Sequence, residues 1–296
     1  MHSLQRAVQL ATVLISFTAL SFGSAIVSGF NSTSDGRNDD GTYTTGGCSN
    51  PASGGTCAGT PVPIGFGVNF YGTTYSSLYV NTNGNVSFDA PFPFVQGLLQ
   101  SGLPGAVNDI IAPYLADVDT RNPASGVVTF GNGTFDGNQA FGVNWLNVGY
   151  FDSNADKLDS FQLLLVKRSD QGPGAFEVVF NYGSMPWETG DADFGSGGLG
   201  GFSAIAGFAN GTGDPTNNMV ELPGSSVPGS FIDGGPNALV SNSLNSNVSG
   251  QYIFDFVGGA PVATPEPETF GLLLCALVGL IYWHASRQAR RSPERK

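Results

Sequence analysis

The sequence predicts an all-β protein: an antiparallel, β-sandwich-like ectodomain flanked by a signal-peptide helix and a C-terminal hydrophobic helix. Turn formers are abundant, with 43 glycines and 18 prolines in 296 residues, and helix formers such as Glu and Lys are scarce. Roughly ten short segments with strand patterns follow one another in residues 62–258, and no amphipathic helix separates them. At 41% hydrophobic residues the chain can bury a substantial core, so a sandwich or related antiparallel fold is expected.

Residues 1–25 have the pattern of a secretory signal peptide. Arg6 is the basic residue at the start, residues 7–20 are apolar, and small residues precede a cleavage site after Ala25. A buried amphipathic helix is the alternative, but it would need polar residues at helical spacing through the apolar run. The chain is therefore expected to be exported.

Residues 26–61 are polar and turn-rich and are expected to form loops. They contain Cys48 and Cys57, and the third cysteine, Cys275, lies in the C-terminal apolar segment. In an exported chain these two cysteines are expected to form a disulfide, which stabilises by roughly 2–3 kcal/mol in a chain-entropy model. A zinc site is not expected, because zinc requires four nitrogen or sulfur ligands.

The regular part begins near residue 62. Apolar residues alternate over residues 64–70, and residues 78–88 predict a hairpin that turns at Asn83-Gly84. Further strand patterns follow at residues 110–121, 126–130, 141–151, 161–167, 176–182, 205–208 and 252–256. Residues 212–250 are rich in Gly, Pro, Asn and Ser, which fits either a long loop excursion or a loosely packed extension.

Charge and histidine content exclude several functions. The net charge is -12 although five of the eleven basic residues lie in the last ten positions, so the rest is strongly acidic and a nucleic-acid partner is not expected. His2 and His284 both fall in the end segments. A Ser-His-Asp or Cys-His device and a His-ligated metal are therefore not expected in the ectodomain, and carboxylate chemistry is what remains for an enzyme. We expect no enzyme.

Asp117 and Asp119 are the candidate metal ligands. Their spacing on a strand would place both carboxylates on one face, with Arg121 next along it. They could ligate calcium, form salt bridges to Arg121, or act as a catalytic pair. No cofactor other than calcium is expected. The acidic runs at residues 152–156 and 191–193 lack the pattern of an EF-hand loop and are expected to be solvated.

Two tryptophans are candidates for sugar binding, because exposed aromatic rings can stack on sugars. Trp145 lies within an apolar strand pattern and is expected in the core. Trp187 follows a strand in a loop and is the candidate ligand-binding residue.

Six segments together resemble the NIDO domain, an extracellular domain of nidogen, alpha-tectorin and mucin-type proteins. They are residues 79–88, 111–121, 143–151, 159–165, 176–182 and 206–208. The resemblance implies an extracellular protein of cell-matrix adhesion or matrix assembly, and it implies no catalytic residues. The chain departs from the family in a glycine-rich insert at residues 195–201 and in lacking EGF-like companion modules, so the binding partner of an animal member is not implied.

The C-terminal segment, residues 259–296, combines three features in order. Pro265-Glu266-Pro267 precedes an apolar segment at about residues 270–284, and an arginine-rich end follows. This combination resembles the PEP-CTERM sorting signal of Gram-negative bacteria. The resemblance implies an exosortase as partner, cleavage near the motif and an organism that makes extracellular polysaccharide. An ordinary membrane anchor is the alternative, and in either case the basic end favours an outward-facing ectodomain.

Three functional hypotheses follow from these patterns. The first is an adhesive or structural protein at the cell surface or in the extracellular matrix, anchored transiently or stably in the inner membrane by its C-terminal helix. The second is a carbohydrate-binding module for extracellular polysaccharide, which requires an exposed Trp187. The third is an extracellular glycosidase, which requires two convergent carboxylates in a pocket.

Overall fold

The computed structural model describes residues 24–45, 59–92, 95–106, 108–214 and 218–262. The predicted signal peptide up to residue 23, Cys48 and Cys57, the Pro265-Glu266-Pro267 motif and the apolar segment at residues 270–284 lie outside the described residues. Within the described part, no helix is long and apolar enough to cross a membrane.

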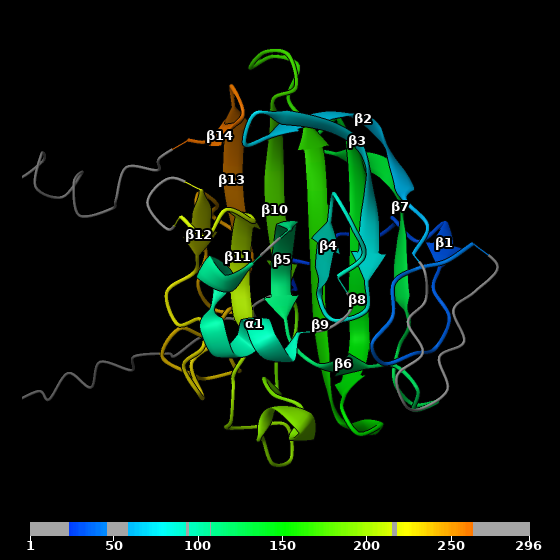
Figure 1. Cartoon of the computed structure of the whole chain (residues 1–296), viewed down its shortest axis with the longest axis vertical. Helices are drawn as coiled ribbons and strands as arrows, with labels where there is room; N and C mark the ends of the chain where they lie inside the picture. The colour runs from blue at the N-terminus through cyan, green and yellow to red at the C-terminus, as the bar shows by residue number, and fades with distance from the viewer. Residues whose placement is uncertain (1–23, 46–58, 93–94, 107, 215–217, 263–296) are drawn as a thin grey trace, which may run out of the picture.

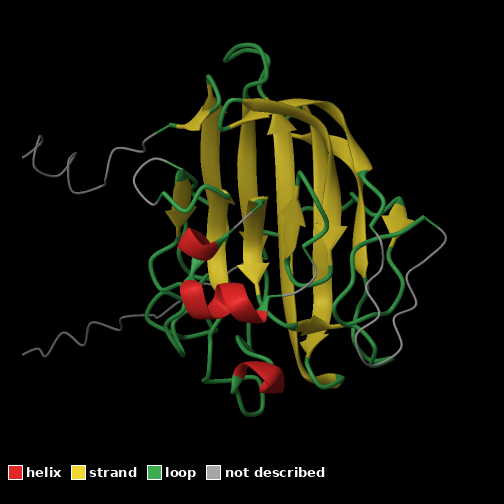
Figure 2. Ribbon diagram, viewed as in Figure 1, coloured by secondary structure: helices red, strands yellow, loops and turns green. Residues whose placement is uncertain are grey.

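Two antiparallel sheets form the molecule (Figures 1 and 2). The eight-stranded sheet has the order β1-β7-β8-β9-β10-β13-β14, and β6 also pairs with β8. Its strands are β1 (Thr33–Ser34), β6 (Val118–Asp119), β7 (Val128–Phe135), β8 (Asn138–Tyr150), β9 (Asn154–Lys167), β10 (Phe176–Tyr182), β13 (Gln251–Val257) and β14 (Ala260–Pro261). The six-stranded sheet has the order β12-β11-β5-β4-β3-β2. Its strands are β2 (Val62–Phe70), β3 (Thr73–Asn81), β4 (Asn85–Ser87), β5 (Asp109–Leu115), β11 (Ile205–Asn210) and β12 (Met219–Glu221). The prediction of an antiparallel sandwich-like fold is confirmed.

The main core lies between the two sheets, and the alternation of side chains along each strand explains which residues belong to it. Phe176, Val178, Phe180 and Tyr182 of β10 all belong to this core, while Val179 belongs to a small cluster on the other face of the sheet. Phe256 on β13 stacks on Phe176 and also contacts rings of the opposite sheet. The period of two in the sequence therefore defines which face of each strand is buried.

The predicted hairpin is confirmed. Strands β3 and β4 pair through Asn81 opposite Asn85 and Val80 opposite Val86, which leaves Asn83-Gly84 in the turn. Gly84 has a φ of +68° and accepts a hydrogen bond from the Tyr114 N–H at its carbonyl. A left-handed residue suits a glycine, which explains why the turn forms here.

A short helix that the sequence did not predict covers the six-stranded sheet. Helix α1 (Gln96–Ser101) and the following 3₁₀ helix η1 (Leu103–Gly105) lie on its outer side (Figure 2). Leu98 and Leu103 pack there against Ile110 of β5 and Ile205 of β11. Six residues are too few for a helical period to stand out from a proline-rich connection, which is why the pattern was missed.

Residues 218–250 form a long excursion that packs closely. The segment contains β12 and a series of turns, and Phe231 and Leu239 are buried in the main core. The loosely packed alternative is therefore excluded for these residues.

The N-terminal segment, residues 24–45, is part of the packed domain. Strand β1 pairs with β7, Phe30 is buried on the outer face of the eight-stranded sheet, and Thr42 forms a β-bridge with Asn81. A segment expected to form only loops thus adds a strand to one sheet and a contact to the other.

Candidate functional site

The site is built where the chain crosses from one sheet to the other. Strand β5 ends at Leu115 in the six-stranded sheet, and after a bend at Ala116 the chain continues as β6, which pairs with β8 in the eight-stranded sheet. Asp117 lies at this crossover, and its carbonyl accepts a hydrogen bond of 3.1 Å from the Phe151 N–H. A continuous strand carrying Asp117 and Asp119 was expected, and this is wrong because the strand breaks at Ala116.

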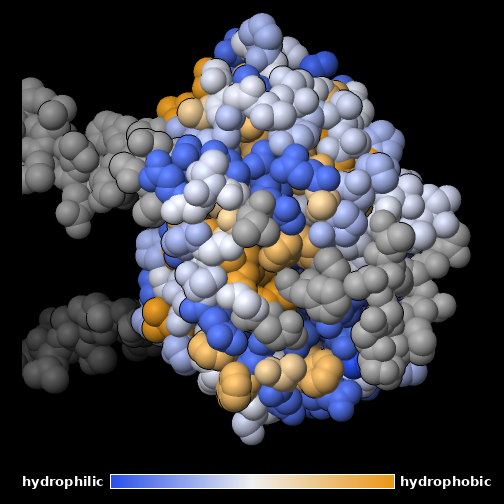
Figure 3. Space-filling model, viewed as in Figure 1, coloured by the Kyte–Doolittle hydropathy of each residue, from blue (hydrophilic) through white to orange (hydrophobic). Residues whose placement is uncertain are grey.

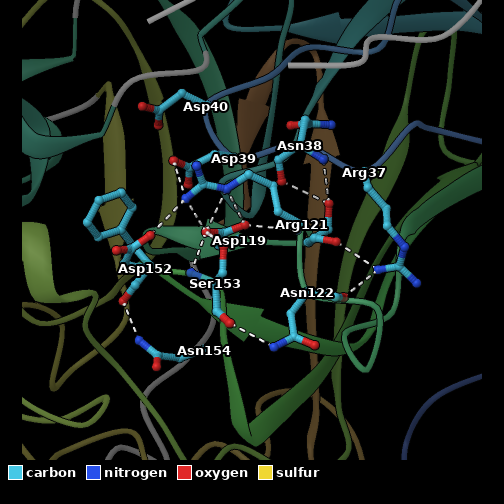
Figure 4. A network of polar contacts seen from close by, with 12 residues as sticks. Arg37, Asn38, Asp39, Asp40, Asp119, Arg121, Asn122, Asp152, Ser153 and Asn154 are labelled. Carbon is cyan, nitrogen blue, oxygen red and sulfur yellow. Dashed lines mark hydrogen bonds and ion pairs between the residues drawn. The ribbon is translucent and has the colours of Figure 1, made fainter. Parts of the chain in front are cut away.

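The Asp119 carboxylate accepts hydrogen bonds from Arg121 and from the chain that follows β8. Its carboxylate accepts hydrogen bonds from the Arg121 backbone N–H at 2.8 Å, from Nε at 2.9 Å and from the Ser153 N–H at 2.7 Å (Figure 4). The Arg121 guanidinium also pairs with Asp39 at 3.1 Å and with the exposed Asp152 at 3.5 Å. Of the alternatives for Asp119, this arrangement supports the salt bridge.

The N-terminal segment brings two further carboxylates to the crossover. The Thr120 N–H donates to the Asn38 carbonyl at 2.9 Å, and the Asn38 N–H donates to the Thr120 hydroxyl oxygen at 2.8 Å. The Arg37 guanidinium donates to the Thr120 carbonyl at 2.7 Å (Figure 4), and the Thr82 N–H donates to the Gly41 carbonyl at 2.9 Å. These contacts place the intervening Asp39 and Asp40 against the body of the domain.

Asp39, Asp40 and Asp117 form one acidic cluster. Each offers a carboxylate oxygen, and the three oxygens all lie within 4.8 Å of one another. Asp117 is 1% exposed, and neither of its oxygens has a hydrogen-bond partner among the described residues. Asp193, in the 3₁₀ helix η2 (Asp191–Asp193), is likewise 1% exposed with both oxygens unpartnered.

Burial and mutual repulsion raise the pKa values of these carboxyl groups. Burial is the largest cause at Asp117, followed by the charges of Asp39, Asp193 and Asp40, and together with the smaller effect of Asp119 they raise its pKa to about 9. Burial and the charges of Asp119 and Asp40 raise the pKa of Asp39 to about 7, although Arg121 opposes the shift. Burial raises the pKa of Asp193 to about 6. The folded domain therefore opposes the ionisation of these carboxyl groups more strongly than its own cations favour it.

This charge predicts a pH dependence of stability in the presence of a chelator. Asp117 has a pKa of 3.8 as its reference and about 9 when folded, so between these values the folded state binds more protons than the unfolded state. The stability that the domain has with Asp117 protonated is fully present below pH 3.8. It is lost as the pH rises from 3.8 towards 9, because the unfolded state releases this proton more readily than the folded state. Asp117→Asn removes this titration. Relative to the unmodified protein, we expect the variant to gain stability with rising pH by up to about 1.4 kcal/mol per pH unit.

Urea denaturation in EDTA between about pH 5 and pH 8.5 measures this difference. Asp39, Asp40, Asp119 and Asp193 face the same carboxyl group and are present in both proteins, so their own titration contributes to both curves. Parallel stability curves for the two proteins would contradict the prediction.

The aromatic candidate Trp187 is not a surface residue, and the prediction that it could stack on a sugar is wrong. Its side chain is completely buried, its Nε1 donates to the Val148 carbonyl at 3.0 Å, and its ring packs against Tyr114 and Tyr150. Gly198, in the glycine-rich insert, lies so close that an added Cβ would be 2.8 Å from the Trp187 Cβ. The insert covers the loop that the sequence placed at the surface.

The expectation for Trp145 is confirmed. It is completely buried, stacks on Phe161 with ring centroids 5.2 Å apart, and donates from Nε1 to the Thr82 carbonyl at 2.9 Å.

Sequence reasoning missed part of the acidic cluster. Asp39 and Asp40 were interpreted only as turn residues, and Asp193 was expected in a solvated loop, which is correct for its neighbour Asp191 but wrong for Asp193 itself. No local pattern could have joined these residues, because Asp39 and Asp40, Asp117, and Asp193 lie in three segments that are distant in sequence. Asp117 was the one member singled out.

Fold and site together define a class: an antiparallel β-sandwich with a buried acidic cluster where its N-terminal segment meets a sheet-to-sheet crossover. A family model described as "NIDO related" matches residues 36–223, and the chain belongs to this family. The matched region includes the acidic cluster, the whole six-stranded sheet and strands β6 to β10 of the eight-stranded sheet.

Individual relatives agree with this assignment. The chain is 29% identical over 213 residues to "Nidogen" of Drosophila melanogaster, an alignment that covers 64% of this chain and 14% of the relative. It is 29% identical over 227 residues to "Alpha-tectorin" of Mus musculus and of Homo sapiens, covering 67% of this chain and 9% of each relative. The chain thus spans only a small fraction of the length of these relatives. No solved structure matches it significantly.

Proposed function

We propose that this protein is an exported adhesive or structural protein of cell-matrix contacts. The observation that carries the proposal is the NIDO-related match over residues 36–223, which spans most of the described sandwich. The NIDO family is associated with cell-matrix adhesion, as noted above. The similarity to nidogen and alpha-tectorin supports an extracellular setting.

The terminal segments extend this proposal to sorting. The signal pattern in residues 1–25, the Pro265-Glu266-Pro267 motif and the basic end support export and recognition by an exosortase in a Gram-negative bacterium. The matrix contacted would then be the extracellular polysaccharide of the cell. A disulfide between Cys48 and Cys57 belongs to the same proposal, because an exported chain folds in an oxidising compartment.

The role proposed is non-enzymatic. A glycosidase must bring a sugar ring between two carboxyl groups, but Asp117 and Asp119 are buried at 1% and 0% exposure. Loss of hydrolysis of a polysaccharide in an Asp117→Asn, Asp119→Asn variant of unchanged stability would be evidence for an enzyme instead.

The test is made in the native host, by measuring both location and mass. We expect the protein in the surface or matrix fraction, with an intact mass that lacks residues 1–25 and the segment after the Pro265-Glu266-Pro267 motif. Deletion of the gene should reduce attachment of cells to their matrix, and restoring the full chain should recover it. A chain without residues 259–296 is the matched control, because it should be exported but not retained.

Two results would contradict the proposal in different ways. A protein that keeps its C-terminal segment on the surface would be an ordinary membrane-anchored ectodomain, and the sorting proposal would be wrong. Unchanged attachment in the deletion strain would exclude the adhesive role.

A further inference from the structure

The acidic cluster of Asp39, Asp40 and Asp117 is unusual because both carboxylate oxygens of the buried Asp117 lack a hydrogen-bond partner among the described residues. Figure 3 shows hydrophilic residues spread over the surface of the molecule, around an apolar area near the middle of that face. Asp117, by contrast, is 1% exposed. A buried polar group without a partner costs free energy, and a buried unpaired charge costs more. Such a side chain needs an explanation.

Arg121 is the cation of the described chain that pairs with this cluster, and it pairs with Asp39 alone. None of the ion pairs among the described residues includes Asp117 or Asp40. Arg121 pairs with Oδ2 of Asp39 and leaves Oδ1 of the same residue buried and without a partner. The free oxygens of Asp39 and Asp117 are therefore available to a ligand that carries positive charge.

The geometry suits a single ion. Two ligands bound to one calcium ion at about 2.4 Å can be at most about 4.8 Å apart, and the three carboxylate oxygens all lie within 4.8 Å of one another. Asp193 adds two buried oxygens without partners, and its charge acts on both Asp117 and Asp40. Asp193 therefore adds negative charge beside the three ligands.

The ligand chemistry favours calcium over other metals. The cluster offers only carboxylate oxygens, which are hard ligands, and zinc would require nitrogen or sulfur. Magnesium binds at about 2.0–2.1 Å with strict octahedral geometry and usually keeps several waters, whereas calcium accepts six to eight oxygens in irregular arrangements. A mostly buried group of carboxylates from separate segments matches calcium better.

We propose that Asp39, Asp40 and Asp117 bind one calcium ion, with Asp193 beside it, and that the ion fastens the N-terminal segment to the sheet-to-sheet crossover. Asp39 and Asp40 belong to the N-terminal segment, whereas Asp117 lies between β5 and β6. An ion shared between them adds a cross-link where hydrogen bonds of Arg37 and Asn38 already hold the segment. The proposal is independent of the adhesive role, which could hold with or without the ion.

The experiment titrates calcium and magnesium into the chelator-treated, full-length protein in detergent, with calorimetry and thermal unfolding as readouts. We expect one calcium per chain with a dissociation constant on the order of 10⁻⁴–10⁻³ M, the range of extracellular modules. At about 10 mM calcium the melting temperature should rise by roughly 4–8 °C. Magnesium should produce a much smaller shift.

Asp117→Asn and Asp39→Asn should each weaken calcium binding by roughly tenfold or more, by loss of a charged ligand. In chelator, Asp117→Asn should melt no lower than the unmodified protein, because it removes a carboxyl group whose ionisation the folded state opposes. This separates a lost ligand from a damaged fold. Asp136→Asn is the matched control, since Asp136 is exposed in a turn and loses the same charge. It should keep the full calcium response.

The proposal is overturned if the unmodified protein shows no calcium heat and no shift in melting temperature, a result that does not depend on any variant folding. It is also overturned if Asp117→Asn responds to calcium as Asp136→Asn does, or if magnesium stabilises as strongly as calcium.

Discussion

Replacing Gly84 with alanine is expected to destabilise the domain by roughly 3 kcal/mol or more. Gly84 has a φ of +68°, and an alanine in the left-handed region costs about 1–2 kcal/mol. The added Cβ would also lie 1.7 Å from the Tyr114 carbonyl oxygen, which is backbone of β5 and cannot move without disturbing the sheet. Overpacking of this kind adds about 1–3 kcal/mol.

Gly137→Ala is the matched control for Gly84→Ala. Gly137 is also a hairpin glycine, with a φ of +79°, but nothing lies within 4 Å of the position that its Cβ would take. We expect Gly137→Ala to lower the free energy of unfolding only by the cost of the left-handed conformation, about 1–2 kcal/mol. Urea denaturation of both variants measures the difference, and equal losses would show that contact with Tyr114 does not matter.

Trp187→Ala is expected to cost roughly 3–5 kcal/mol, as for other fully buried aromatic residues. The substitution removes the ring that packs between Tyr114 and Tyr150, and it leaves the Val148 carbonyl without its donor. Trp187→Phe keeps a ring but not the Nε1 donor, so it should lose less. Thermal or urea unfolding measures both variants.

The control for Trp187→Ala is Leu199→Ala, in the insert that covers Trp187. Leu199 is 39% exposed, and its truncation should change stability by no more than about 0.5 kcal/mol. The opposite result for Trp187 is equally informative. A Trp187→Ala variant of unchanged stability would contradict the prediction that this buried ring stabilises the core.

Local patterns were sufficient for most of the sheet structure. The alternation in residues 64–70 and 176–182 identified β2 and β10, and Asn83-Gly84 identified the turn between β3 and β4. These features depend on residues close together in the chain, so they are visible in the sequence. Helix α1 was missed because it is only six residues long.

The environment of single side chains was harder to predict. Trp187 stands after a strand in a polar loop, and only the folding of a distant glycine-rich insert over it makes it a core residue. Asp117 and Asp119 have the same side chain and lie two residues apart. The Asp119 carboxylate nevertheless accepts hydrogen bonds from Arg121 and Ser153, whereas the Asp117 carboxylate has no hydrogen-bond partner among the described residues.

The sequence by itself determined the fold class, the positions of most strands, the core residue Trp145 and the resemblance to the NIDO family. Strand periodicity and turn chemistry are local properties of the chain. Only the tertiary structure decided which carboxylates meet. Asp39, Asp40 and Asp117 converge because the N-terminal segment docks where β5 gives way to β6, and the contacts that hold it there join residues far apart in sequence. Burial and the neighbouring carboxylates then raise the pKa of Asp117, and no local pattern in the sequence predicts this shift.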